Sequence, residues 1–483
     1  MLKCPINSFP DLDPGAEKLR PRNIPMNPSY LLRVVSISVA LLQCTTALAD
    51  DKSDRTLDRD LKNVLVRLGF TGRIEETLQS KLGRPVNPEL ADLGRNLFFD
   101  KILSLKGDNA CAGCHSPSRG FGDTQSIAIG IDNNNIVGKD RSGPRNQRRT
   151  PMVLNTAFFP NLMWNSRFSA VSGSSFNNSL GFVFPQPEGL TLSNQPHLLN
   201  AQAFIPPTER IEMAGFEFPG GNHEIRTEVI NRLNESAAYH TRFRAAFPEL
   251  HDNDITYDML AAALAEFQIS LTFANAPIDR FARGDSKAMS KDLKKGALLF
   301  FGKARCVNCH SVSGNSNEMF SDFATHVVGV PQISPVFTNA VFDGPAQNED
   351  FGLEQVTGNS SDRYRFRSSP LRNVALQPTF FHNGAFTRLE DAIQHHLDVA
   401  KSVRNYRPSK HVAADLAGPV GPMAPVLARL DKQLQSPTKL TNAEFQQLVA
   451  FVRFGLLDER SFFLDSQIPT TLVSGQEPLE FEE

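Results

Sequence analysis

The sequence predicts a mainly α-helical fold with two similar domains in tandem and long irregular loops. Two segments, 87–99 and 290–301, place apolar residues three and four positions apart, which is the spacing of an amphipathic helix. Further helical patterns cover 255–271 and the segment from Thr441, where Thr441 and Glu444 have the spacing of a capping box. Strands of alternating polarity are scarce, and Gly-, Asn-, Ser- and Pro-rich segments separate the helices.

One stretch of sequence occurs twice. "LGRNLFFD" precedes "CAGCH" in the first half, and "KGALLFFG" precedes "CVNCH" in the second, each followed by a Phe-x-Asp. We interpret this repeat as two diverged copies of one small domain. The predicted boundaries are an N-terminal domain over 50–284, a C-terminal domain over 285–470 and an acidic tail over 471–483.

The first 49 residues resemble an export signal rather than part of the fold. Arg33 precedes an apolar run, and a small-residue cleavage site ends at Ala49. We expect Met26 to be the true start, with residues 1–25 a mis-called extension. The apolar run is too short for a permanent membrane span, so the prediction is a soluble protein of the periplasm. A formal net charge of −2 gives no reason to expect a nucleic-acid partner.

Cleavage would remove Cys4 and Cys44 and leave two Cys-x-x-Cys-His motifs. The two cysteines of such a motif form thioethers to one haem, and the histidine becomes an axial ligand of the iron. A zinc site with four thiolates and a thioredoxin-like dithiol are the alternatives, but neither requires the histidines or the repeat. We therefore expect two covalently bound c-type haems, each in a cytochrome c-like domain. The residues predicted to hold them are Cys111, Cys114 and His115, and Cys306, Cys309 and His310.

From about residue 85 to 460 the chain resembles the bacterial di-haem cytochrome c peroxidases, including their MauG-like relatives. The resemblance depends on the two Cys motifs and on "RRTPMVLNTAF", "LMWNSRF", "IEMAG" and "FRSSPLRNVALQPTFFHNGAF". It implies a periplasmic enzyme that reduces hydrogen peroxide to water. The N-terminal haem would be the peroxide site. The C-terminal haem would relay electrons from a small c-type cytochrome or a copper protein.

The resemblance also assigns two catalytic residues. Glu212 matches the family's acid–base carboxylate, and Trp164 matches a tryptophan between the haems that carries an electron hole. A surface glutamate and a core anchor are the respective alternatives. The segment 126–151 contains no histidine where typical members carry a distal one. We therefore expect an open or water-capped peroxide iron that needs no reductive activation.

The sixth ligand of the C-terminal haem is predicted to be His396, at a position where the family usually has Met or Tyr. Met423 in "GPVGPMAPV" is the alternative, followed by Tyr406, His395 or an open site. His395 is adjacent in sequence but points about 100° away around the helix, so the two histidines cannot face the same iron.

A calcium ion between the domains is a further expectation from the resemblance, left open here. Arg149 stands where the family has a liganding Asn, although Asn146 and the backbone oxygens around Ser368 and Ser369 remain available. Two other functions also remain open. One is MauG-like oxidation of a partner protein, which the missing distal histidine permits. The other is a non-catalytic di-haem electron carrier or redox sensor, which would not need Glu212.

Overall fold

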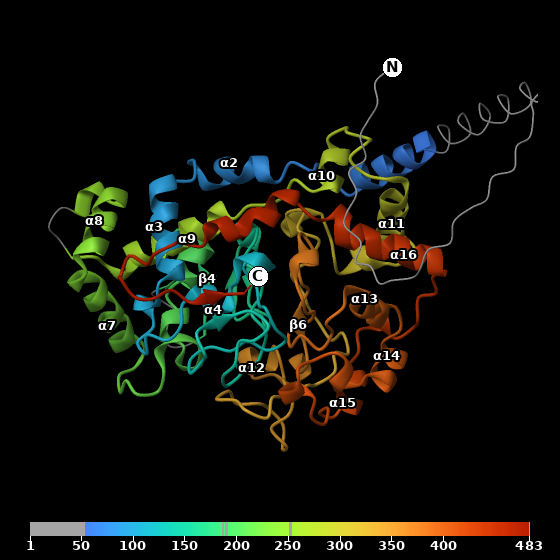
Figure 1. Ribbon diagram of the computed structural model, residues 1–483. Helices are drawn as coiled ribbons and strands as arrows, with labels where there is room; N and C mark the ends of the chain where they lie inside the picture. Colours follow the sequence, from blue (N-terminus) through green and yellow to red (C-terminus); the bar gives the residue numbers. More distant parts are fainter. Residues whose placement is uncertain (1–53, 186–187, 189–191, 251–253, 483) are drawn as a thin grey trace, which may run out of the picture. The chain divides into compact units, whose positions relative to one another are not determined.

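A computed structural model describes residues 54–185, 188, 192–250 and 254–482 of the chain. The predicted signal peptide, with Met26 and the cleavage site at Ala49, lies outside the described residues. Helices dominate, as the sequence predicts (Figure 1). They are a helix over 54–67, α2 (Leu78–Leu82), α3 (Pro88–Phe99), α4 (Cys111–Cys114), α6 (Leu198–Gln202), α7 (Asn222–Glu235), α8 (Ala237–Ala246), α9 (Tyr257–Ser270), α10 (Pro277–Ala282), α11 (Lys291–Phe301), α12 (Glu354–Thr357), α13 (Leu389–Leu397), α14 (Val399–Asn405), α15 (Ala424–Leu427) and α16 (Asn442–Ala450).

The described strands are short and form three small sheets. They are β1 (Ile136–Val137), β2 (Asn161–Leu162), β3 (Phe168–Ala170), β4 (Phe182–Val183), β5 (Thr325–His326), β6 (Phe366–Arg367) and β7 (Glu480–Phe481). β2, β3 and β4 form an antiparallel sheet, β5 pairs antiparallel with β6, and β1 pairs parallel with β7. Among the described helices, none is both long and apolar enough to cross a bilayer.

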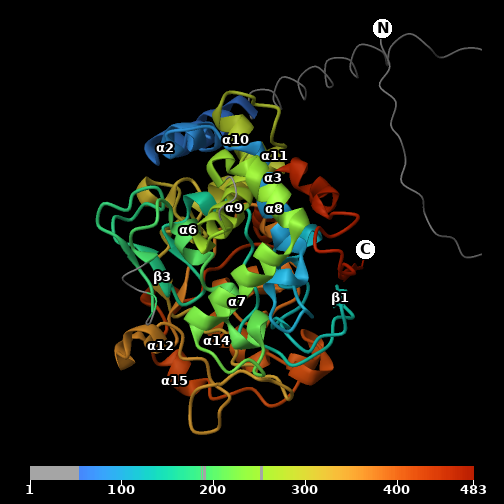
Figure 2. The ribbon, with the colours of Figure 1, turned by 90° about the vertical axis from the view of Figure 1, so that its left-hand side faces the viewer.

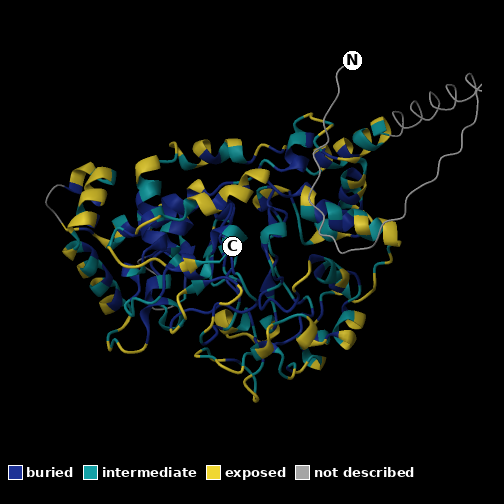
Figure 3. Ribbon diagram, viewed as in Figure 1, coloured by how far each residue is buried: buried dark blue, intermediate teal, exposed yellow. Residues whose placement is uncertain are grey.

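Two helices of the first half cross at a glycine. A Cβ atom on Gly94 of α3 would lie 1.9 Å from the carbonyl oxygen of Ala263 on α9, so only glycine permits this approach. Phe98 of α3 then contacts Phe267 of α9, with ring centroids 5.3 Å apart. Both helices contribute to the largest of the described apolar clusters, and the sides on which they meet are buried (Figure 3).

The second half repeats this contact. A Cβ atom on Gly296 of α11 would lie 2.0 Å from the carbonyl oxygen of Gln447 on α16. Phe300 of α11 contacts Phe451, which follows α16, with ring centroids 5.5 Å apart. Gly94 and Phe98 correspond to Gly296 and Phe300 in the sequence repeat, so the repeated residues make equivalent contacts in the two halves.

Two terminal segments of the described chain pack on the half to which they do not belong in sequence. Leu61 and Leu65 of the helix over 54–67 lie in the apolar cluster of the second half. The C-terminal segment runs to the first half, where β7 pairs with β1 (Figure 2). Ser474 there donates hydrogen bonds to Asp100 through its backbone N (3.0 Å) and its hydroxyl (2.7 Å).

Candidate functional site

The first Cys motif lies in α4, at a cavity of the first half. Cys111, Cys114 and His115 all line this cavity. Nδ1 of His115 lies 2.8 Å from the carbonyl oxygen of Phe121, a residue with a positive φ of 55°. This contact makes Nδ1 the protonated nitrogen and leaves the lone pair on Nε2, the arrangement that a metal-ligating histidine needs. Burial lowers the pKa of His115 to about 4, so the ring is neutral.

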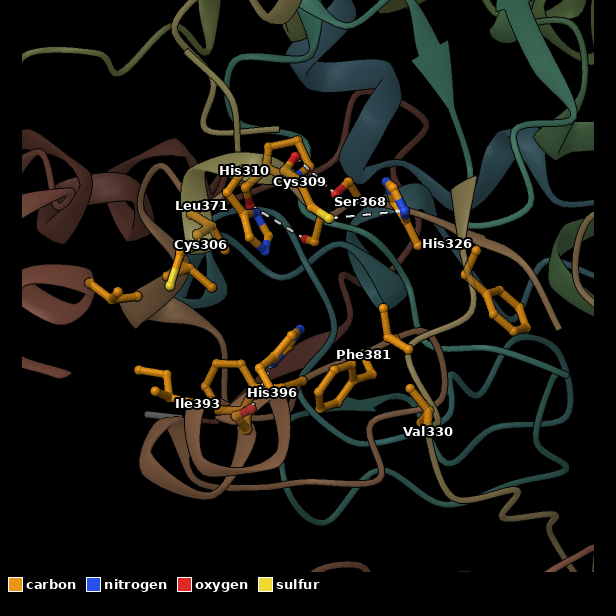
Figure 4. A pocket seen from close by; sticks show the side chains of 18 of the residues that line it. Cys306, Cys309, His310, His326, Val330, Ser368, Leu371, Phe381, Ile393 and His396 are labelled. Carbon is orange, nitrogen blue, oxygen red and sulfur yellow. Dashed lines mark hydrogen bonds between the residues drawn. The ribbon is translucent and has the colours of Figure 1, made fainter. Parts of the chain in front are cut away.

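The second Cys motif lines another cavity and repeats the arrangement (Figure 4). Nδ1 of His310 lies 3.0 Å from the carbonyl oxygen of Phe320, which also has a positive φ, 56°. Burial lowers the pKa of His310 to about 4 as well. Each half therefore presents a neutral imidazole with a free Nε2 beside two cysteines. The residues present fit a c-type haem in each cavity.

The alternative chemistries of the cysteines fit less well. The two Cys pairs line separate cavities, so the four thiols do not converge on one zinc ion. Burial raises the pKa of the Cys111 and Cys306 thiols to about 12. A thioredoxin-like dithiol needs the opposite shift, because the thiolate is the reactive form.

His396 on α13 faces His310 across the second cavity (Figure 4). The two ring centroids are 6.3 Å apart. Two metal–nitrogen bonds of about 2 Å each, with about 1 Å from each nitrogen to its ring centre, require about 6 Å. Nδ1 of His396 lies 2.8 Å from the carbonyl oxygen of Ala392, which again leaves Nε2 free. The spacing thus suits two imidazoles on one iron.

The other candidates for this position lie elsewhere. Both ring nitrogens of His395 are occupied, by the hydroxyl of Ser402 at 3.0 Å and the carbonyl oxygen of Val328 at 2.8 Å. Tyr406 donates a hydrogen bond of 2.6 Å to the carbonyl oxygen of Ala385. Met423 packs in a separate small cluster with Val426. None of the three lines the second cavity.

Glu212 lies in the wall of the first cavity, on a π-helical turn, η6 (Arg210–Ala214). Asn109, two residues before Cys111, donates a hydrogen bond of 2.9 Å to the carbonyl oxygen of Glu212 and so joins this turn to the Cys motif. No described residue donates a hydrogen bond to its carboxylate. Burial, reinforced by the nearby Glu209 and opposed by Arg167, raises the pKa of Glu212 to about 7. This value is suited to a group that exchanges protons at neutral pH.

The first cavity lacks a second histidine. Within the described part of the chain, His115 is the one histidine that lines it. The segment 126–151 instead contributes mainly polar and basic side chains to this wall. The uncapped peroxide site stays a prediction.

Trp164 contributes to the walls of both cavities. Its indole is 6% exposed, and Nε1 donates a hydrogen bond of 2.9 Å to the carbonyl oxygen of Arg149. The position suits both roles that the sequence leaves open, a path between the two sites and a core anchor.

The residues considered for calcium line the cavities: Asn146 lines the first, Ser368 and Ser369 line the second, and Arg149 lines both. The side-chain oxygen of Asn146 is buried and has no hydrogen-bond partner in the described chain. Arg149 is buried nearby, while Ser368 donates a hydrogen bond of 3.2 Å to the carbonyl oxygen of Cys309. Calcium stays an expectation from the resemblance.

Sequence reasoning missed His326, which lies beside Cys309 in the second cavity (Figure 4). Its ring lies between two carboxylates, with Nε2 3.0 Å from Asp322 and Nδ1 2.6 Å from Asp431. These carboxylates raise the pKa of His326 to about 11, so the ring is a cation. Asp322 is four residues away, but Asp431 is distant in sequence, and no local signal indicates that contact.

Comparison with known proteins supports the reading of these cavities. The family model described as di-haem cytochrome c peroxidase matches residues 88–287. The MauG protein of Methylophilus methylotrophus is 28% identical over 328 residues, which cover 66% of this chain and 76% of that protein. The cytochrome c551 peroxidase of Nitrosomonas europaea is 28% identical over 313 residues, which cover 64% and 73%.

The chain thus resembles the di-haem cytochrome c peroxidases and MauG proteins, as its sequence motifs predict. Solved structures share the fold. A MauG-like protein associated with microbial copper homeostasis aligns over 78% of this chain and 92% of its own, with a TM-score of 0.55 and 23% identity. The di-haem peroxidase BthA of Burkholderia thailandensis aligns over 82% and 91%, with a TM-score of 0.51 and 19% identity.

This similarity confirms three predictions at a coarse level. The fold is helix-rich and of the di-haem peroxidase type. The predicted enzyme class, an oxidoreductase of the cytochrome c peroxidase type, is that of the family. The family's cofactor is haem, which the residues that line the two cavities fit. The tandem-domain boundaries and the individual site residues stay predictions.

Proposed function

We propose that this protein is a periplasmic di-haem c-type peroxidase that reduces hydrogen peroxide to water. Each turnover would consume one peroxide, two electrons and two protons and release two water molecules. The observation that carries the proposal is the carboxylate of Glu212, which is half-buried in the wall of the cavity that His115 also lines and has no hydrogen-bond partner in the described chain. A protein that only carried electrons would not need such a group.

Each haem is held by its own motif in this proposal. Cys111 and Cys114 would form the thioethers in the N-terminal domain, and His115 would bind the iron. Cys306, Cys309 and His310 would do the same in the C-terminal domain, and His396 would supply a further nitrogen ligand there. The haems, when bound, supply the site where peroxide binds and the store for the electrons that reduce it.

Glu212 moves the proton in this scheme. The cleavage of peroxide is easier when a base takes the proton from one oxygen and returns it to the other as that oxygen leaves. A carboxyl group with a pKa of about 7 can do both at neutral pH, because neither form is strongly favoured. The pair of Arg167 and Glu209, 2.8 Å apart in the same wall, would set the field that Glu212 experiences.

Electrons would enter at the C-terminal haem and pass to the N-terminal one. Trp164 is the indole at the wall common to both cavities, and its ring is the easily oxidised group on that route. The donor would be a small c-type cytochrome or a copper protein, as the named cytochrome c peroxidase relatives suggest. Export and cleavage after Ala49 would bring the enzyme to the compartment of such donors.

MauG-like oxidation of a partner protein is the second candidate. Two observations favour it, namely the absence of a second histidine in the described lining of the first cavity and the similarity to MauG proteins. A peroxidase that needs no reductive activation would share the first feature. Calcium between the domains remains part of the proposal as an auxiliary ion.

Steady-state assays decide between these functions. The purified holoenzyme is mixed with hydrogen peroxide and a reduced small cytochrome c, and the oxidation of the donor is followed. We expect two donor molecules oxidised per peroxide from the first turnover, without prior reduction of the enzyme. Peroxide consumption without donor oxidation, accompanied by a chemical change in an added protein, would favour the MauG-like function instead.

A further inference from the structure

Five arginine side chains are buried in the described part of the chain, and they differ in what they meet. They are Arg141, Arg145, Arg149, Arg367 and Arg372. Two of them pair with carboxylates, since Arg372 donates two hydrogen bonds to Asp279 (2.7 and 2.8 Å) and Arg145 pairs with Asp415. The guanidinium of Arg141 donates to four oxygen acceptors between 2.8 and 3.2 Å away. Arg149 and Arg367 have neither a paired carboxylate nor such a set of oxygen acceptors.

Arg367 has no carboxylate partner. It is 5% exposed, and Nε donates one hydrogen bond of 3.0 Å to the carbonyl oxygen of Met163. Its Nη1 is buried without any partner in the described chain. The guanidinium lies 5.6 Å from the ring of Phe159 and 5.7 Å from that of Phe323, which are weak cation–π contacts and supply no anion. Burial alone lowers the pKa of this guanidinium, to about 10, and no nearby carboxylate offsets that effect.

Arg149 is in a similar position. It is 5% exposed, donates a hydrogen bond to the neutral amide of Gln377, and has a buried Nε without a partner in the described chain. Asp123 is near enough to interact electrostatically with Arg149. The carboxylate of Asp123 accepts hydrogen bonds from the backbone of Gln125 (3.1 Å) and Thr150 (2.9 Å) instead.

Both arginines line both cavities, beside Trp164. Removing a cation from water costs several kcal/mol unless an anion and hydrogen bonds compensate for it. Two such cations with free N–H groups at one wall therefore indicate acidic groups that enter the cavities from outside the chain. A haem held by two thioethers brings two carboxylates of its own, on its propionate side chains.

We infer that Arg149 and Arg367 bind the haem propionates and form a shared positive wall between the two haems. The inference depends on the proposed attachment of haem in both cavities. Planar guanidinium groups match carboxylates with two parallel hydrogen bonds, so this wall fixes the orientation of the haem edges as well as their charge. Since Trp164 lies at the same wall, the pairing also holds the haem edges beside the proposed electron path.

The test uses the holoenzyme. Its haem carries carbon-13 at the carboxyl groups of the propionates, so that infrared spectra report on these groups. Redox titration and infrared difference spectra are compared for wild type, Arg367→Gln, Arg367→Lys and Arg365→Gln. Arg365 directly precedes β6, which contains Arg367. Its guanidinium donates a hydrogen bond to Thr325 and does not line either cavity, so Arg365→Gln is the matched control. Arg149→Gln is measured in the same way.

We expect Arg367→Gln to shift the reduction equilibrium of at least one haem about tenfold toward the oxidised form, which is 59 mV for one electron. The labelled carboxylate bands should shift with it, because the carboxylate loses its cation. Arg367→Lys should restore part of the potential, and Arg365→Gln should have none of these effects. Labelled bands and potentials that match wild type in both the Arg367→Gln and Arg149→Gln proteins would overturn the inference.

A measurement on the wild-type protein covers the case in which the variants do not fold. A buried carboxyl without a cation titrates well above its usual range, whereas one paired with arginine stays ionised to about pH 5 or below. Protonation of all labelled carboxyls above about pH 6 would therefore also overturn the inference. The titration does not depend on peroxide turnover. A separate measurement of the haem content shows whether the cofactor is attached.

Discussion

The imidazole rings of His310 and His396 face each other with their centroids 6.3 Å apart, and each Nδ1 lies within hydrogen-bond distance of a backbone carbonyl oxygen. Both free Nε2 atoms therefore belong to the one cavity that holds the second Cys motif. The proposed pair of axial ligands has specific spectroscopic consequences.

His396→Ala should convert the C-terminal haem from low-spin, bis-histidine ligation to a form with an open or water-filled sixth position. The ferric near-infrared charge-transfer band should change accordingly, while the N-terminal haem keeps its spectrum. Met423→Ala is the control, because Met423 packs outside the cavity. A histidine–methionine band that persists in His396→Ala and disappears in Met423→Ala would show that Met423 is the ligand.

Glu212→Gln should reduce peroxidase turnover by roughly 10²–10⁴-fold, because the amide keeps the shape of the side chain and cannot exchange the proton. Both haem spectra should stay normal. Glu217→Gln is the matched control, since Glu217 is nearby, exposed and paired with Lys106. Turnover in Glu212→Gln equal to that of the control would remove Glu212 from the mechanism.

The pH profile offers a second test of Glu212. Burial raises its pKa to about 7, so the basic carboxylate form is present above this value and disappears below it. At limiting peroxide, kcat/KM should therefore fall as the pH decreases through about 7. The Glu212→Gln protein should lack this inflection. A wild-type profile that is flat between pH 5 and 8 would contradict the assignment of the base.

Trp164→Phe should slow the electron transfer between the haems and leave the first reaction with peroxide intact. Phenylalanine keeps an apolar ring in the wall, but it is harder to oxidise and cannot donate the hydrogen bond to Arg149. Rapid mixing with peroxide, followed by absorption of both haems, separates the two steps. Transfer as fast as in the wild type would leave Trp164 as a packing residue.

Gly94→Ala and Gly296→Ala should each destabilise the protein by about 1–3 kcal/mol, the usual cost of overpacking a tight contact. In each case the new methyl group would meet a backbone carbonyl about 2 Å away on the crossing helix. Thermal unfolding followed by circular dichroism measures the effect. Gly418→Ala is the control, because nothing lies within 4 Å of its added Cβ. Melting temperatures equal to the control's would show that the helices can separate at little cost.

Local patterns predicted several of the helices well. The amphipathic segment 87–99 is α3 (Pro88–Phe99), and Thr441 and Glu444 form the expected capping box at the start of α16. The different directions of His395 and His396 also follow from helical geometry, and the structure has them in different environments. Each of these features depends on residues within a few positions of one another.

Local patterns could not predict the contacts between residues that are far apart in the sequence. Asp431 reaches His326 across more than a hundred residues, and Arg149 and Arg367 line the same wall because the segment around Trp164 meets β6 there. A single sequence carries no period or spacing that marks these pairs, since each partner appears locally as an ordinary charged residue. The tertiary fold alone brings them together.

The pairing of β7 with β1 brings a segment that is distant in sequence to the first Cys motif. Leu479 clusters with Ala110, directly before that motif, and would lie 3.1 Å from a Cβ added to Gly113 within it. A substitution at Leu479 would therefore change the packing behind the first Cys motif without altering any residue that is proposed to hold the cofactor.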